Sequence, residues 1–166
     1  MIKRSIIILC LLLVFISLLS LLLPSAISVA RSSVVFASDE TISREINNPD
    51  NWSNWFPPLK EGLMTIRKVS DDEAVLQKSV DRSMTLKFDY KGVDSTVCTI
   101  TPQSGDAVSY TFLQTPADSG VRVTLIANVK LAWYPWQRVR GVFMDKILGA
   151  QYDEALAGLK ARCEKP

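Results

Sequence analysis

Six stretches of alternating apolar and polar residues lie between residues 63 and 133, and they constrain the fold more than any other feature of the sequence. In the longest stretch, every second residue from Val121 to Trp133 is apolar, whereas Arg122 and Lys130 lie between them. A period of two predicts β-strands with one buried face and one solvent-exposed face. Segments containing Ser, Asp and Gly separate the stretches, as in hairpin turns. The stretches are 63–69, 73–80, 83–90, 94–101, 107–114 and 121–133.

A seventh strand and two short helices precede this region. Residues 26–36 alternate in the same way and predict the strand. Ser38 or Asp39 can cap a first helix, because a side-chain oxygen at this position accepts a bond from a free backbone N–H. Asn48 can cap a second helix, with a proline in its first turn. The prolines at 57–58 are expected to end that second helix.

The C-terminal region predicts one long helix that begins at Pro135. Its apolar residues recur at the i, i+3, i+4 spacing of an amphipathic helix. The pattern slips by one position near Gly149. We expect both halves of the apolar stripe to pack on the apolar face of the sheet, since no other large apolar surface is available. The stripe consists of Trp136, Val139, Phe143 and Ile147, then Tyr152, Leu156, Leu159 and Cys163.

This order of elements predicts an α+β fold. A seven-stranded, curved antiparallel sheet wraps the long C-terminal helix, and the two short helices after strand 1 close one end. A cavity can remain between the sheet and the long helix, and the inward side chains either line it or fill it. Trp55 is expected to pack under the end of the sheet or against the long helix, and if a cavity exists, the corner that contains Trp55 would be its lid. The other inward residues are Phe88, Tyr110, Phe112, Leu125, Trp133, Trp136 and Phe143.

Residues 5–23 form a separate N-terminal unit of 19 residues without a charge. As a helix this stretch would span about 28 Å, enough for the apolar core of a bilayer. Lys3 and Arg4 precede it, so the positive-inside rule places the N-terminus in the cytoplasm and the rest outside. The expected organisation is a cytoplasmic stub at 1–4, a transmembrane helix at 5–23 and an extracytoplasmic domain at 26–166.

A cleaved signal peptide is the alternative for this segment. The residues "SVA" at 28–30 fit a cleavage site, and cleavage there would make the domain a secreted protein. Two arguments favour an uncleaved anchor. The apolar stretch is longer than the ~7–15 residues typical of a signal peptide, and cleavage after Ala30 would cut the first predicted strand in half.

Charge and composition exclude several classes of function. Residues 1–31 hold three of the 19 bases and none of the 17 acids, which leaves 16 bases against 17 acids in the rest. A nearly neutral domain without a basic cluster is not expected to bind nucleic acid. The chain has no histidine, the most common general base and metal ligand. No catalytic triad, metal-ligand spacing or phosphate-binding loop is present, so no catalytic residue, metal or cofactor is predicted.

The sequence contains three cysteines. Cys10 lies in the apolar stretch. Cys98 and Cys163 would face an oxidising compartment if the domain is extracytoplasmic. They either form a disulfide or remain as two small buried residues, and the spacing alone does not decide between these alternatives.

Two stretches resemble the SRPBCC superfamily, which includes START lipid-transfer domains, the birch pollen allergen family and the polyketide cyclase/dehydrase group. Residues 27–55 resemble its opening strand and helix pair, with Asp50, Trp52 and Trp55 at the positions of the family's aspartate–tryptophan–x–x–tryptophan-like corner. Residues 133–165 resemble the entry and end of its long helix. The end of the helix matches at Gly158, Leu159 and Lys160.

The resemblance implies a helix-grip fold over about residues 26–166. Residues 23–36, "LPSAISVARSSVVF", also resemble a membrane-anchored subgroup in which the span leads directly into the first strand. Members of the superfamily bind lipids, polyketides or hormones, so the resemblance is less specific for activity than for fold.

The favoured function is the binding of a hydrophobic small molecule or lipid in an internal cavity, without catalysis. An enzyme of the polyketide cyclase/dehydrase type is one alternative, with Tyr110 and a nearby acid as the reacting groups. An envelope scaffold or stress-response module is another, and its surface residues would be Asn51, Asn54 and Lys60. The sequence names no specific protein partner.

Overall fold

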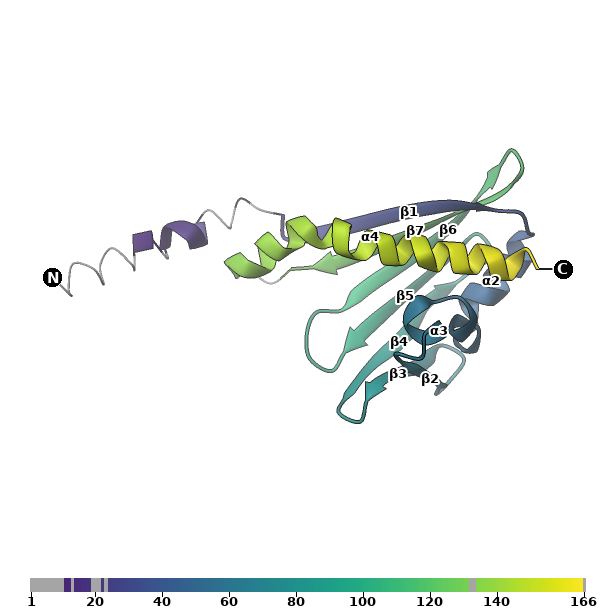
Figure 1. Cartoon of the computed structure of the whole chain (residues 1–166), viewed down its shortest axis with the longest axis horizontal. Helices are drawn as coiled ribbons and strands as arrows, with labels where there is room; N and C mark the ends of the chain where they lie inside the picture. Colours follow the sequence, from purple (N-terminus) through teal and green to yellow (C-terminus); the bar gives the residue numbers. More distant parts are fainter. Residues whose placement is uncertain (1–10, 13, 19–21, 23, 132–133, 166) are drawn as a thin grey trace.

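A seven-stranded antiparallel sheet and one long helix form the two layers of the domain (Figure 1). The structure, a computed structural model, describes residues 11–12, 14–18, 22, 24–131 and 134–165. The order of strands in the sheet is β1-β7-β6-β5-β4-β3-β2, so the first strand pairs with the last. The strands are β1 Ala26–Val35, β2 Thr65–Lys68, β3 Glu73–Ser79, β4 Arg82–Lys91, β5 Ser95–Pro102, β6 Val108–Ala117 and β7 Gly120–Lys130.

Three short helices and one long helix complete the domain. They are α2 Asp39–Asn47, the 3₁₀ helix η1 Pro49–Asn54, α3 Pro57–Lys60 and α4 Pro135–Cys163. The α+β class, the seven antiparallel strands and the long C-terminal helix confirm the predicted architecture. Within the part of the chain that the structure describes, no helix is both long enough and apolar enough to span a membrane. Much of the predicted span at 5–23 lies outside the described residues.

The predicted alternation is clearest in β7. Val121, Val123, Leu125, Ala127 and Val129 are buried in turn, and the residues between them are exposed or partly buried. The alternation in β4 is interrupted, because the pairing of β4 with β5 shifts between Phe88 and Tyr90. Phe88 is buried, whereas Tyr90 is exposed. The alternation over residues 83–90 predicts that Tyr90 shares one face with Phe88, and this prediction is wrong because the irregularity reorients the strand.

The short helices between β1 and β2 begin where the sequence predicts, with one exception. The segment that follows α2, residues 48–60, is called the corner. Ser38 caps α2 by accepting a hydrogen bond from the backbone N–H of Thr41 at 3.3 Å. Asn48 caps η1 by accepting from the N–H of Asp50 at 3.2 Å. However, η1 ends at Asn54, and the prolines at 57–58 begin the additional helix α3. Proline suits this position because the first turn of a helix does not need its N–H.

The predicted apolar stripe of helix α4 packs on the sheet in the second half of the helix only. Tyr152, Leu156 and Leu159 are buried, whereas Phe143 and Ile147 are 54% and 63% exposed. At about 100° per residue, the helix surface turns by a net 140° or so between Ile147 and Tyr152. The slip near Gly149 therefore moves the apolar stripe from the outer side of the helix to the inner side. The prediction that both halves of the stripe pack on the sheet is wrong for the first half.

An arginine on β1 joins that strand to the middle of α4. The Arg31 guanidinium lies 3.0 Å from a carboxylate oxygen of Asp145 and 3.4 Å from one of Asp153. It covers Gly149, where a Cβ atom would overlap the guanidinium. The hydrogen bond to Asp145 is the main cause that raises the Arg31 pKa. A glycine on this turn therefore lets the arginine lie flat against the helix.

A second glycine sets the distance between α4 and the corner. A Cβ atom on Gly158 would lie 2.5 Å from the backbone oxygen of Trp55. We expect Gly158→Ala to lower the free energy of unfolding by about 1–3 kcal/mol, because the helix must move away from the corner. Urea denaturation followed by circular dichroism measures this change.

The matched control for this prediction is Ala157→Gly, at an exposed neighbouring position on α4. This control isolates helix propensity, which favours alanine over glycine by about 0.5–1 kcal/mol. If Gly158→Ala instead stabilised the protein by such an amount, helix propensity alone would account for it, and the close approach of Trp55 to α4 would be contradicted.

Candidate functional site

An aromatic cluster fills one end of the space between the sheet and α4. Trp52 is 1% exposed and lies at its centre. Its ring centroid is 5.2 Å from that of Trp55, 5.3 Å from Phe56, 6.1 Å from Phe88 and 6.0 Å from Phe112. The rings meet in tilted or edge-to-face orientations, which are the favoured geometries of aromatic pairs. This end of the space is therefore occupied by side chains.

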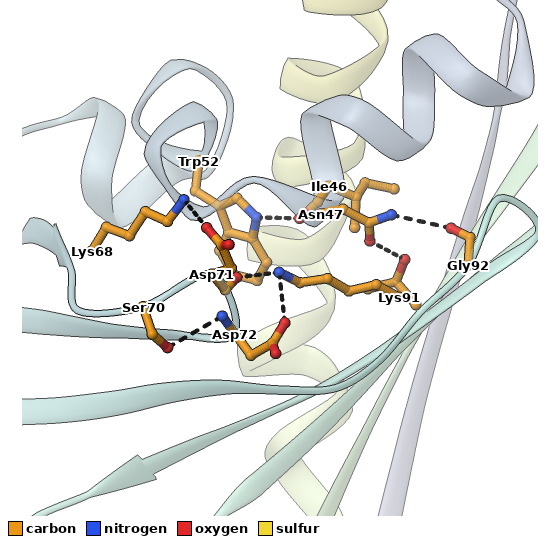
Figure 2. Close-up of polar contacts among 10 residues, drawn as sticks. Ile46, Asn47, Trp52, Lys68, Ser70, Asp71, Asp72, Lys91 and Gly92 are labelled. Carbon is orange, nitrogen blue, oxygen red and sulfur yellow. Dashed lines mark hydrogen bonds and ion pairs between the residues drawn. The ribbon is translucent and has the colours of Figure 1, made fainter.

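The two indole groups of the corner also bind the end of α2. The indole N–H of Trp52 donates to the backbone oxygen of Ile46 at 2.8 Å (Figure 2). The indole N–H of Trp55 donates to the backbone oxygen of Glu45 at 3.4 Å. Carbonyls in the last turn of a helix lack partners within that helix, so the indoles satisfy two of them. The corner thus holds α2 through both apolar and polar contacts.

A buried polar network ties α2 to the sheet. The Asn47 side chain donates to the backbone oxygen of Gly92 at 3.1 Å and accepts from the Thr96 hydroxyl at 2.6 Å (Figure 2). The amide of Gln114 donates to the Ser43 hydroxyl at 2.8 Å. Because buried polar groups are costly when unpaired, these bonds favour a single position for α2.

Ion pairs stabilise the turn between β2 and β3, which lies beside the corner. Lys91 forms an ion pair of 3.1 Å with Asp72, bonds to the backbone oxygen of Asp71, and lies 4.3 Å above the centre of the Phe88 ring. Lys68 pairs with Asp71 at 2.7 Å (Figure 2). Their hydrogen bond is the main cause that lowers the pKa of Asp71 and raises the pKa of Lys68. These contacts hold the turn against the aromatic cluster.

A pocket of about 190 Å³ remains beside the cluster, between α3, the middle of α4 and strands β3 to β6. We call it the inner pocket. Its walls are mostly apolar, and Tyr110, Asp106 and Gln151 supply polar groups. Such a lining suits an apolar molecule that carries few polar atoms. The remaining lining residues are Phe56, Pro58, Met64, Leu76, Met84, Ile100, Pro102 and Val108.

A second pocket of about 440 Å³ adjoins the inner pocket and is called the outer groove. Both are bordered by Met64, Met84 and Pro102, so these residues form the boundary between them. The outer groove lies against the β3–β4 and β5–β6 turns and is more polar. Its other lining residues are Lys78, Asp81, Arg82, Ser83, Gln103 and Ser104.

Two tyrosines meet beside the inner pocket. The hydroxyl oxygens of Tyr110 and Tyr152 are 3.4 Å apart, and their rings meet edge to face with centroids 5.9 Å apart. Burial is the main cause that raises the pKa of Tyr110 well above its usual value, and the neighbouring Tyr152 raises it further. Burial also raises the pKa of Tyr152. Both phenols are therefore neutral at pH 7 and can donate hydrogen bonds.

The residues predicted to line the cavity divide into four groups. Tyr110 lines the inner pocket. Trp55, Phe88, Phe112 and Leu125 are buried in the core, outside that lining. Trp136 and Phe143 are exposed on α4, because the apolar stripe of the first half of this helix points away from the sheet. Trp133 lies outside the described residues. Ligand contact by any of these residues stays a prediction.

The sequence analysis did not select several residues of the inner pocket, although the alternation of their strands places them on inward faces. Met84 shares the inward face of β4 with Leu86 and Phe88, and Val108 shares that of β6 with Tyr110. Selecting the largest aromatic residues therefore identified the packed core. The open space lies beside smaller and more flexible side chains.

The corner residues considered for protein contacts, Asn54 and Lys60, are exposed, and Asn51 is partly buried. Contact of these residues with a protein stays a prediction.

Cys98 and Cys163 are both buried and carry free thiols. Burial raises the pKa of Cys98 far above its usual value, and it is the main cause that raises that of Cys163 to about 11. Thiols react as thiolates, so both groups are expected to be inert at neutral pH. Of the two alternatives for these cysteines, the structure shows the unpaired one.

The family model described as polyketide cyclase / dehydrase and lipid transport matches residues 26–164. The chain belongs to this family. The match covers the whole sheet, the corner and all of α4, so every residue of the inner pocket is a residue of the family domain.

Solved structures share the helix-grip fold of this family member. A START superfamily protein from Mycobacterium smegmatis has a TM-score of 0.65 at 15% identity, over 82% of this chain and 97% of that chain. Protein CV1439 from Chromobacterium violaceum has a TM-score of 0.61 at 14% identity, over 86% of this chain and 100% of that chain.

A third similar structure is the di-domain ARO/CYC StfQ from the steffimycin biosynthetic pathway. It has a TM-score of 0.63 at 11% identity, over 84% of this chain and 51% of that chain. Identities in this range show a common fold and leave activity open. A comparison with curated proteins found no match.

Proposed function

We propose that this member of the polyketide cyclase / dehydrase and lipid transport family binds a small apolar or lipid-like molecule without transforming it. The inner pocket carries this proposal, because it is a mostly apolar space beside the packed aromatic cluster. The apolar part of the ligand would contact Leu76, Ile100 and Val108. Its polar part would meet Tyr110 and Gln151, or extend past Met84 into the outer groove.

The size of the space limits the ligand. The inner pocket of about 190 Å³ is smaller than the ~300–1,000 Å³ of typical small-molecule sites. The outer groove of about 440 Å³ borders it through Met64, Met84 and Pro102. A ligand that occupies both would therefore place its apolar part inside and leave its polar end near Lys78 and Arg82. An amphipathic molecule has this division of character.

We further propose that residues 5–23 anchor the protein in a membrane and place the domain outside the cytoplasm. The uncharged 19-residue stretch and the preceding Lys3 and Arg4 support this location. An anchored pocket beside a bilayer has access to lipids and to other apolar molecules dissolved there. Protease accessibility in intact cells tests the location, because an extracytoplasmic domain is cleaved while the cells remain closed.

Blocking the inner pocket tests the binding function. Val108 lines it, so we expect Val108→Trp to fill it and to weaken the binding of a fluorescent fatty acid by the domain of residues 24–166 by at least about tenfold. Val93→Trp is the matched control, because Val93 is 54% exposed on the turn between β4 and β5 and lies outside both pocket linings.

Two results of this titration would contradict the proposal. One is a wild-type domain that does not bind the probe, and the other is a Val108→Trp domain that folds and binds the probe as tightly as the wild type. Circular dichroism establishes that each variant is folded. Met64→Trp, at the boundary with the outer groove, provides a second blocked pocket if Val108→Trp does not fold.

The tyrosine pair supports an enzyme as the second candidate. Tyr110 borders the inner pocket, and the hydroxyl oxygen of Tyr152 lies 3.4 Å from that of Tyr110. Asp106 and Gln151 are further polar groups in the lining. A neutral phenol can donate a hydrogen bond to a carbonyl oxygen and stabilise an enol or enolate. If the protein acts as a cyclase, Tyr110→Phe is expected to lower turnover of a polyketone by about 10²–10⁴-fold.

The readout that separates the two candidates is turnover against binding. A wild-type protein that binds a polyketone and returns it unchanged rejects the enzyme and leaves the binding function. A wild-type protein whose cyclisation rate falls in Tyr110→Phe, with unchanged affinity, rejects the non-catalytic proposal.

A further inference from the structure

We propose that the first half of α4 lies on the surface of a lipid bilayer through an exposed apolar face. This face, called the docking face, consists of Trp136, Val139, Phe143 and Ile147. The proposal rests on the membrane location proposed above and adds a second contact with the membrane. It would fix the orientation of the domain, and therefore of its pocket, relative to the bilayer.

The exposure of the docking face is the first observation. The side chains of Trp136, Val139, Phe143 and Ile147 are 69%, 50%, 54% and 63% exposed. Their spacing places them on one side of the helix. On the other side, Gly141 faces Ile27 of β1 and Gly149 faces Arg31. Four large apolar side chains in one exposed row are unusual for a surface in contact only with water.

The second half of α4 shows that this exposure is local. The outer side of the second half carries Ala150, Glu154, Ala157 and Ala161, all exposed. These residues are small or charged, as expected for a helix side that faces water. The docking face is therefore confined to the half of α4 that extends away from the aromatic corner.

The position of the docking face is the second observation. The backbone N–H of Leu131 donates to the oxygen of Ser25 at 2.9 Å, so the chain that leads into β1 lies beside the chain that leads into α4. Figure 1 shows the beginning of α4 at the end of the domain from which residues 14–18 project. In that described segment, Phe15 and Leu18 are 58% and 60% exposed. Two exposed apolar surfaces thus lie toward the same end of the molecule.

Side-chain chemistry at this end matches a membrane surface. Tyr134 and Trp136 stack with centroids 5.2 Å apart and an interplanar angle of 8°. Tyrosine and tryptophan favour the interface between headgroups and acyl chains. Residues 130–149 contain four bases and one acid, and that acid, Asp145, pairs with Arg31. Residues 150–165 contain three of each, so the basic excess coincides with the docking face.

This basic excess favours a bilayer over a second copy of the chain. Two copies that met through their docking faces would bring together two regions of the same net positive charge, because such an interface is symmetric. Anionic headgroups would instead complement these charges while the apolar side chains enter the acyl region. The occupant with matching chemistry is therefore a bilayer that contains anionic lipid.

Spin labels on the full-length chain in phosphatidylcholine–phosphatidylglycerol vesicles test the proposal. One label is placed at Phe143→Cys in the docking face, and the matched control at Ala157→Cys, on the exposed side of the second half. Both variants also carry Cys10→Ala, and the remaining thiols of Cys98 and Cys163 are buried. Accessibility to oxygen relative to a water-soluble nickel chelate reports the depth of each label.

We expect this accessibility ratio to be several-fold higher at position 143 than at position 157. A label at position 143 that is as exposed to the nickel chelate as the label at position 157 would overturn the proposal. Spin–spin broadening at position 143 at low protein density would also overturn it, because a second copy would then cover the face.

A label on the natural Cys10 of the wild-type chain separates this proposal from the anchor on which it rests. A deep label at Cys10 with a water-exposed label at position 143 overturns the docking face and leaves the anchor. Water-exposed labels at both positions reject the anchor and the docking face together.

Discussion

Replacing Trp52 by alanine is expected to lower the free energy of unfolding by about 3–5 kcal/mol. Trp52 is 1% exposed and contacts four other aromatic rings, so its removal leaves a cavity that the surrounding side chains do not fill. The substitution also removes the hydrogen bond from the indole to the backbone oxygen of Ile46. The carbonyl at the end of α2 then loses its partner, which adds to the cost.

Trp136→Ala is the matched control, because it removes the same side chain from a position that is 69% exposed. In water this variant is expected to change the free energy of unfolding by at most about 0.5 kcal/mol. Equilibrium unfolding in guanidinium chloride measures both variants. Equal effects of the two substitutions would contradict the central position of Trp52 in the core.

Alkaline pH is the second condition with a large expected effect. Burial raises the pKa of Cys98 and of Tyr110 in the folded protein, so both groups keep their protons there after the unfolded chain has released them. The folded state then binds more protons than the unfolded state, and stability falls as pH rises. The stabilisation is complete below the unfolded pKa values, about 8.5 for a thiol and about 10 for a phenol.

The expected slope is about −1.4 kcal/mol per pH unit from Cys98 above pH ~9, with a similar contribution from Tyr110 above pH ~10. Urea titrations at a series of pH values measure this slope. Cys98→Ala is expected to remove the contribution of Cys98 that begins near pH 9, where Cys163 also contributes up to its pKa of about 11, and Tyr110→Phe is expected to remove the contribution of Tyr110 that begins near pH 10. A free energy of unfolding that stays constant between pH 8 and 11 would contradict the burial of these groups.

The sheet could be predicted because each strand carries its own signal. The alternation from Val121 to Val129 fixes which face of β7 is buried, and the same rule holds on β1 and from Phe112 to Thr115 of β6. The irregularity between Phe88 and Tyr90 could not be predicted, because it depends on the pairing of β4 with β5. Local alternation therefore predicts the faces of a strand until a change in register interrupts it.

The burial of α4 was predictable only in part for a different reason. Its two apolar rows have the same helical spacing, yet one row faces the sheet at Leu156 and the other is exposed at Phe143. Amphipathic spacing shows that a row needs an apolar environment and does not say which environment supplies it. The slip near Gly149 indicates that the two rows face different sides of the helix, because a rotation of about 140° separates them.

The pocket could not be located from the sequence, because an empty space is a property of packing. Phe88 and Phe112 contact the tryptophans of the corner, which fill one end of the space between sheet and helix. Space remains beside Met84 and Val108, which alternation alone identifies as core residues. Tyr110 was identified correctly as an inward residue with a polar group, and the structure adds Tyr152 as its neighbour.

Native mass spectrometry of the full-length chain, released from its own membranes, tests the ligand-binding function most directly. We predict that the wild-type protein carries one apolar molecule of lipid-like mass and that folded Val108→Trp lacks it, whereas Val93→Trp retains it. A wild-type protein without any bound molecule, or an equal amount bound to Val108→Trp, would contradict the proposed function.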